Sequence, residues 1–102
     1  MAASPPPKGY WIGRVDVHDP QAYKRYVEAN GPVFEKYGAR FLVRGGAFEN
    51  PEGTSRARQV VLEFDSYEKA RACYHSSDYQ DILGLRTAHS EGDMVIVEGW
   101  DG

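Results

Sequence analysis

Arg44 and Glu63 are the first residues in this sequence whose types and spacing could support chemistry. Each lies in a short alternating run, Ala39–Gly46 or Arg58–Asp65, and the two runs predict paired β-strands. An arginine in a partly enclosed cleft on this sheet face could hold the carboxylate or enolate of a small substrate. The two residues could equally form a cross-strand ion pair that fixes the strand register. Both interpretations stay open.

The same face of the predicted sheet carries further charges. Arg14 and Asp16 belong to an alternating run at 10–17, and Glu98 ends the last apolar run of the chain. Gly45 and Gly46 follow Arg44, and a glycine pair at a strand end indicates a bulge or a close backbone approach.

Tyrosine is abundant, with seven among 102 residues. Most aromatic side chains in a small domain belong to its core, but a buried hydroxyl also needs a hydrogen-bond partner. Of the tyrosines on predicted helices, Tyr26, Tyr74 and Tyr79 could line the gap between helices and sheet, which would suit a small organic acid or a phenolic molecule. The candidate ligand-binding residues are Tyr10, Arg14, Tyr26, Arg44, Glu63, Tyr74 and Tyr79.

Histidine and cysteine offer little catalytic or metal-binding chemistry. His75 ends the second predicted helix, where the helix dipole favours its charge, and it is also a candidate general base or axial ligand. The candidate catalytic residues are therefore Arg44, Glu63 and His75. Cys73 is the single cysteine, the histidines are dispersed, and no nucleotide-binding fingerprint is present. We expect neither a metal nor a redox cofactor, and no spacing identifies a reaction.

The elements that must position these residues follow from periodicity and capping signals. Asp19-Pro20 is a helix start, Gly31-Pro32 predicts a kink or short break, and Gly38 ends this helix. Ser66 begins a second helix. The remaining expected elements are strands at 10–17, 39–46, 58–65 and 94–98, a short third helix capped within 76–78, and a turn at 91–93.

This order, β-α-β-β-α-(α)-β, predicts an α+β fold on the ferredoxin-like, split βαβ plan. We expect a four-stranded antiparallel sheet with its first and third strands central and all helices on one face. Residues 1–8 are read as a flexible tail, and 9–102 as a single domain.

Alternation also assigns the two faces of the sheet. The uniformly apolar set, expected to meet the helices, is Trp11, Val15, Val17, Phe41, Val43, Val60, Leu62, Phe64, Val95 and Val97. The mixed set on the other face is Tyr10, Ile12, Arg14, Asp16, Leu42, Arg44, Val61, Glu63, Met94, Ile96 and Glu98. No further element remains to cover the mixed face, so we expect a homodimer formed through it.

Composition excludes several classes of partner. The net charge of −3 gives no positive field for nucleic acid or an anionic membrane, and no apolar run approaches the length of a membrane span. The start of the chain lacks the apolar region of a secretory signal, so a cytoplasmic location is expected.

The sequence resembles the uncharacterised family named domain of unknown function 1330, a member of the dimeric α+β barrel superfamily. The matching segments are YWIGRVDV at 10–17, RFLVRGG at 40–46, VVLEF at 60–64, ACYHS at 72–76 and GDMVIVEG at 92–99. Ser77 departs from the pattern, since many members of the family are expected to carry proline there. The resemblance implies a homodimer in which two ferredoxin-like sheets close into a barrel-like core.

The resemblance implies no single reaction. Relatives in the superfamily include cofactor-free monooxygenases, lactone isomerases and haem-handling enzymes. Three functions therefore remain open: binding of a small organic acid or phenolic molecule, catalysis of a monooxygenase or isomerase type without a cofactor, and a non-catalytic structural or stress-related dimerisation module.

Overall fold

Strand β1 (Gly9–Val17) is central in the sheet, between β3 (Arg58–Phe64) and β4 (Ser90–Glu98). β2 (Arg40–Arg44) lies outside β3, so the strand order is β2-β3-β1-β4 and each neighbouring pair is antiparallel. The computed structural model describes residues 5–101. Residues 1–4 of the predicted tail, and Gly102, lie outside the described residues.

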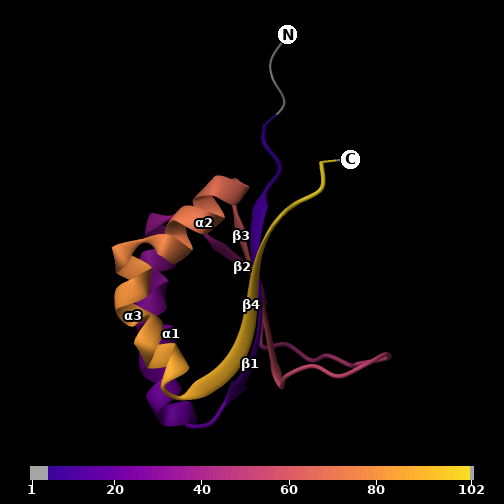
Figure 1. Cartoon of the computed structure of the whole chain (residues 1–102), viewed down its shortest axis with the longest axis vertical. Helices are drawn as coiled ribbons and strands as arrows, with labels where there is room; N and C mark the ends of the chain where they lie inside the picture. The colour runs from indigo at the N-terminus through magenta and orange to yellow at the C-terminus, as the bar shows by residue number, and fades with distance from the viewer. Residues whose placement is uncertain (1–4, 102) are drawn as a thin grey trace.

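Three helices cover one face of this sheet: α1 (Pro20–Lys36), α2 (Tyr67–His75) and α3 (Ser77–Thr87) (Figure 1). Each begins at a side-chain cap. Asp19 accepts the N–H of Ala22, and Ser66 accepts that of Lys69, both at 3.1 Å. Ser76 accepts the N–H of Tyr79 at the same distance. The predicted ferredoxin-like α+β fold is confirmed.

Helix α1 continues through Pro32 without the predicted break. A proline inside a helix leaves the carbonyl four residues earlier without its usual donor. Pro32 and Glu28 are both exposed, so water can satisfy that carbonyl on the outer side of the helix. The helix ends before Gly38, whose φ of +70° suits a glycine terminator.

The core between helices and sheet is built around Trp11, which is 1% exposed. Its indole Nε1 donates to the carbonyl of Ala70 at 2.8 Å, so its polar atom is satisfied. Its ring contacts those of Phe34 and Phe64, each with centroids 5.3 Å away, and that of Tyr79 at 4.9 Å. Burial of an aromatic side chain of this kind stabilises a fold by roughly 1.5–3 kcal/mol.

The predicted arrangement of the last strand was wrong in two respects. β4 begins at Ser90 rather than Met94, and residues 91–93 pair with β1 instead of forming a turn. In addition, Ile96 lies opposite Trp11 and faces the helices, whereas Val95 is 51% exposed on the other face. In this strand the residues of both faces are apolar, so only the pairing with β1 determines which of them face the helices.

The predicted orientation of Arg44 was also wrong, because β2 contains a bulge. Phe41 pairs with Leu62, but the register shifts before Val43, which pairs with Val61. Arg44 then pairs with Val60, so its side chain faces the helices and not Glu63. Leu42 is the extra residue, and Val43 turns outward.

The sheet face opposite the helices, here named the open face, has no element over it within residues 5–101. Its exposed apolar residues include Val43, Val95 and Val97. The connection between β2 and β3 projects on this side, away from the helices (Figure 1). At its root, Arg56 contacts Asp16 and Asp93 at 2.9 Å, and this ties the hairpin to β1 and β4.

Candidate ligand-binding pocket

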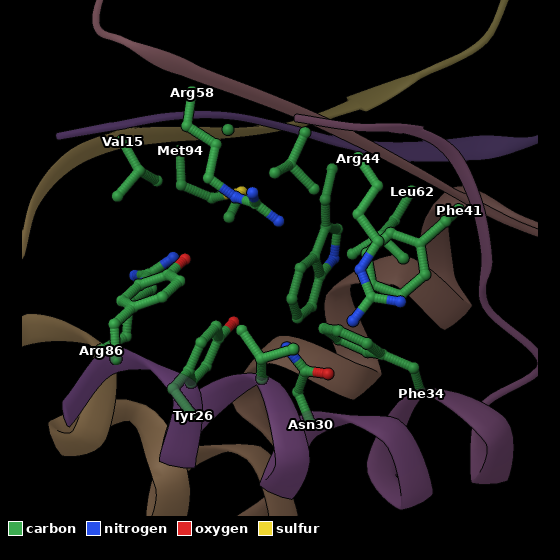
Figure 2. Close-up of a pocket in the computed structure, with 15 residues that line it drawn as sticks. Val15, Tyr26, Asn30, Phe34, Phe41, Arg44, Arg58, Leu62, Arg86 and Met94 are labelled. Carbon is green, nitrogen blue, oxygen red and sulfur yellow. The ribbon is translucent and has the colours of Figure 1, made fainter. Parts of the chain in front are cut away.

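A cavity lies between the inner face of the sheet and helices α1 and α3 (Figure 2). Its enclosed volume is about 30 Å³, room for about two water molecules. It is therefore a narrow slot. Its lining is mainly aromatic and aliphatic, with a small set of polar residues: Tyr23, Tyr26, Asn30, Arg44, Arg58 and Arg86.

Three arginines from three different elements line this slot. Arg44 comes from β2 because of the bulge, Arg58 comes from β3, and Arg86 comes from the last turn of α3. Within residues 5–101, none of the three has a carboxylate within 4.0 Å, whereas Arg40 and Arg56 each have several. The pocket lining contains no acidic residue. The site therefore carries uncompensated positive charge, which favours an anion.

Backbone features place two of these arginines. Gly45 has a φ of +70°, and a Cβ atom on it would lie 2.5 Å from Nη1 of Arg58. A side chain at position 45 would therefore displace that guanidinium. The hydroxyl of Ser90 donates to the carbonyl of Arg86, which fixes the end of α3 against β4. Arg44 stacks over the ring of Phe41, with 4.3 Å between Cζ and the ring centroid.

Two buried polar atoms in the slot have no hydrogen-bond partner. They are Oδ1 of Asn30 and Nε of Arg58, and among the described residues no other side chain leaves such an atom. Asn30 is 5% exposed on α1. A buried acceptor or donor without a partner costs about 1–3 kcal/mol, so its retention calls for an explanation. Both residues line the same cavity, where a ligand could supply the partners of these atoms.

The tyrosine hydroxyls beside the slot stay neutral well above neutral pH. Burial raises the pKa of Tyr26, which shares a 2.8 Å hydrogen bond with Tyr79, although Tyr79, Arg86 and Asn30 partly oppose the shift. Burial also raises the pKa of Tyr79. It raises the pKa of Tyr23 too, while Arg58 and Arg86 act against this change.

The structure brings together only two of the predicted ligand-binding residues, Tyr26 and Arg44. Tyr79 is fully buried behind the slot, and Tyr74 packs against Tyr79 without lining it. The other three, Tyr10, Arg14 and Glu63, lie on the open face. His75, a candidate catalytic residue, ends α2 outside the slot.

On the open face, Glu63 belongs to a surface cluster. Its carboxylate accepts the hydroxyl of Tyr10 at 3.1 Å and lies 3.0 Å from the guanidinium of Arg40, which in turn contacts Asp65 at 3.2 Å. The hydrogen bond to Glu63 raises the pKa of Tyr10. Arg40, and not Arg44, is therefore the partner of Glu63. Arg14 is exposed and donates to Gln59 at 3.2 Å.

Sequence reasoning missed Asn30, Arg58 and Arg86, although each carries a positional signal. Arg58 shares the alternation of Val60, which places it on the helix-facing side. Asn30 is four residues from Tyr26 and four from Phe34, so it falls on the buried stripe of α1. Arg86 follows Tyr79 by seven residues and lies on the same side of α3.

Other kinds of site find less support in this geometry. Across residues 5–101, no group of three His, Cys, Asp or Glu side chains is placed to hold a metal ion. Among the helices of the same residues, none combines the length and apolar character needed to cross a membrane.

Comparison of the sequence with protein families gives one match. The profile described as "Domain of unknown function (DUF1330)" covers residues 8–100. None of the curated proteins is significantly similar to the chain in sequence.

Solved structures with the same fold include three informative neighbours. The RPA0582 protein of unknown function from Rhodopseudomonas palustris has a TM-score of 0.71 and 14% identity, covering 94% of this chain and 85% of that one. SnoaB, a cofactor-independent oxygenase from Streptomyces nogalater, has a TM-score of 0.65 and 12% identity, covering 94% and 96%. A dimeric ferredoxin-like protein of unknown function from Thermobifida fusca has a TM-score of 0.60 and 14% identity, covering 91% and 92%. Likeness at this identity establishes the fold alone.

Proposed function

Since the chain belongs to the DUF1330 family, whose description states no activity, we propose a function from the pocket itself: the protein binds a small organic acid between its helices and its sheet. The observation that carries this proposal is the buried Nε of Arg58, a donor without a partner, in a cavity that three arginines line without an acidic residue. A bound acid would accept from Arg58 and neutralise the charge that gathers there.

The composition of the lining, apolar walls with a few polar groups, supports the same proposal. Ligand pockets are usually apolar slots in which a small number of polar groups fix the ligand's orientation. Here Phe34, Phe41 and Val60 supply apolar surface, and Arg44 and Arg58 supply donors. The slot as it stands is too small for an organic acid, so the flexible arginine side chains must move outward to admit one, and a flat ligand requires the smallest movement.

Isothermal titration with benzoate tests this proposal. The full-length protein should bind benzoate, and Arg58→Gln should weaken binding about tenfold or more, because it removes a charged hydrogen bond. Arg25→Gln is the matched control, since Arg25 is exposed on α1 and outside the slot. The proposal fails if benzoate does not bind, or if both variants bind it as tightly as the wild type.

A second candidate is enolate chemistry without a cofactor. The fold is shared with SnoaB, whose description states a cofactor-independent oxygenase, and the arginines of the slot would stabilise an enolate as well as a carboxylate. Oxygen uptake with an enolisable aromatic ligand separates this candidate from simple binding. Uptake that persists in Arg58→Gln would argue against the slot as its site.

We also propose that two copies of the chain associate through their open faces. The exposed apolar residues Val43, Val95 and Val97 on an uncovered sheet support this assembly. The structural neighbour from Thermobifida fusca, a dimeric ferredoxin-like protein, adds to that support. If no ligand of any class binds, such a dimer without a small-molecule function is the remaining interpretation.

A further inference from the structure

The two unpartnered atoms of the slot have opposite hydrogen-bonding polarity. Arg58 Nε is a donor and requires an acceptor, whereas Asn30 Oδ1 is an acceptor and requires a donor. A simple carboxylate such as benzoate satisfies only the first of these. A ligand that satisfies both atoms must carry an acid group together with a separate donor.

The charge around the slot indicates the chemical type of the ligand's acceptor and of its donor. Arg44, Arg58 and Arg86 line it without any acidic residue, so the acceptor is an anionic group. The same charge opposes an ammonium group, because a cation next to these guanidinium groups would be repelled. The donor that faces Asn30 is therefore a neutral group, and a hydroxyl is the smallest neutral donor that a narrow slot can admit.

The side chains between these polar atoms indicate the shape of the ligand's carbon skeleton. Arg58 and Arg86 lie at one end of the slot, beside Val15 and Met94, and Arg44 lies at the other end, beside Phe34 and Phe41 (Figure 2). Tyr26 and Asn30 lie on α1 between the two ends. Phe34 meets the ring of Phe41 edge-on at 5.6 Å, which gives the slot an aromatic side. Once the arginine side chains move outward, a flat, rigid ring can pack against these aromatic walls and needs the least widening of the slot.

We infer that the ligand of this pocket is a planar aromatic hydroxy acid, with its acid group held by Arg58 and its hydroxyl donating to Oδ1 of Asn30. This inference rests on the proposed binding of an organic acid and adds the ligand's second functional group. It makes Asn30 a specificity-determining residue, since this residue distinguishes hydroxylated acids from plain ones.

A ligand series tests the inference with the unaltered protein. The probes are benzoate, its three monohydroxy isomers and the three matched fluorobenzoates, in which fluorine replaces the hydroxyl but cannot donate. We expect at least one hydroxybenzoate to bind about tenfold more tightly than both benzoate and its own fluoro analogue. Equal affinity across the whole series would overturn the inference while leaving the binding of organic acids in place.

Substitution of Asn30 tests whether its side chain causes the preference for hydroxylated acids. Asn30→Leu, similar in volume, should remove the preference for the hydroxyl, so that each hydroxybenzoate binds no more tightly than its fluoro analogue, because the acceptor of the hydroxyl has been removed. If this variant does not fold, Asn30→Ala serves for the same comparison of affinities. A preference that survives in the folded variant contradicts the assignment to Asn30. Failure of every acid in the series to bind would instead overturn both this inference and the proposed function.

Discussion

Arg58 illustrates how single residues determine this site. Its guanidinium can occupy the slot because position 45 carries no side chain, and its Nε is buried without a partner. Asn30 on the facing helix is buried at 5% exposure with an equally unpartnered oxygen. Polar groups of this kind reduce the stability of the fold, and the ligand that we propose would supply the partner of Arg58.

Substitution of Gly45 tests the placement of Arg58. Gly45→Ala should destabilise the fold by about 1–2 kcal/mol, because φ is +70°, and it should also weaken binding of benzoate, because the new Cβ displaces the guanidinium. Gly53→Ala is the matched control, since Gly53 has a φ of +72° and open space around it. Urea unfolding and titration measure the two effects. If Gly53→Ala weakens binding as much as Gly45→Ala does, the contact with Arg58 has no role.

Buried ionisable groups predict a loss of stability in alkali. Burial, and to a lesser extent Asp78, raise the pKa of the Cys73 thiol to about 12, and burial likewise raises the pKa of Tyr79. The unfolded chain releases these protons at lower pH than the folded one, so the free energy of unfolding should be constant up to about pH 9 and then fall. Urea titrations from pH 7 to 11 measure it. Tyr79→Phe should reduce the slope, and an unchanged stability up to pH 11 would contradict the burial of these groups.

Among the elements, β2 determines which arginine serves the slot. Its bulge moves Arg44 from the open face to the inner face and leaves Arg40 as the partner of Glu63. Arg44 then contributes a contact with Phe41 and repulsion with other arginines, and these two effects oppose each other in the stability of the fold.

Substitutions of Arg44 and Arg40 should therefore have different effects on stability and on binding of benzoate. Arg44→Ala should leave the free energy of unfolding within about 1 kcal/mol of the wild type, or raise it, and should weaken binding of benzoate. Arg40→Ala should lower stability by about 0.5–1 kcal/mol, because its ion pairs with Glu63 and Asp65 are partly exposed, and should leave binding intact. Thermal unfolding and titration of both variants check this. The reverse pattern would show that Arg44 is the structural residue.

The elements also show how far sequence reasoning reaches. The helix caps at Asp19 and Ser66 were predictable, because a cap depends on the side chain at the start of the helix. Strands with one apolar face were predictable too, because alternation within the segment shows them. The residues of β4 that face the helices were not predictable. Met94 to Val97 are apolar at every position, so only the pairing with β1 determines which of them face the helices. The orientation of Arg44 depended on a bulge between Phe41 and Val43, whereas the glycine pair predicted a bulge or a close backbone approach at positions 45 and 46.

The candidate site was less predictable than the fold for a related reason. Glu63 was expected beside Arg44 from simple alternation, and one extra residue in β2 separated them. Arg58 and Arg86 meet only because β3 and α3 pack on opposite sides of the same slot. Tertiary contacts of this kind do not follow from the periodicity of a single segment.

At the scale of the whole molecule, the open face is the feature that an isolated chain leaves unexplained. A charge placed there should act on assembly and not on the inner core. Val95→Glu should shift the protein from a particle of twice the 11.4 kDa chain mass to a single chain, because Val95 is 51% exposed on the face that we propose to be buried between copies. Light scattering behind a sizing column at micromolar concentration measures this mass.

A matched variant on the helical side controls this experiment. Thr87→Glu lies at the exposed end of α3, away from the open face, and should leave the mass of the particle unchanged. A wild-type protein that elutes as a single chain would contradict assembly through the open face. Dissociation by Thr87→Glu alone would place the interface elsewhere.

The central claim, that the slot holds an organic acid, is tested most directly by the fluorescence of Trp11. Trp11 lines the slot and is 1% exposed, whereas Trp100 is 92% exposed, so Trp100→Phe leaves Trp11 as the single indole of the chain. Benzoate titrated into this variant should produce a saturable change in emission, and the additional substitution Arg58→Gln should move the midpoint to about tenfold higher concentration or more. Emission that stays constant across the titration, or an identical midpoint with and without Arg58, would contradict the claim.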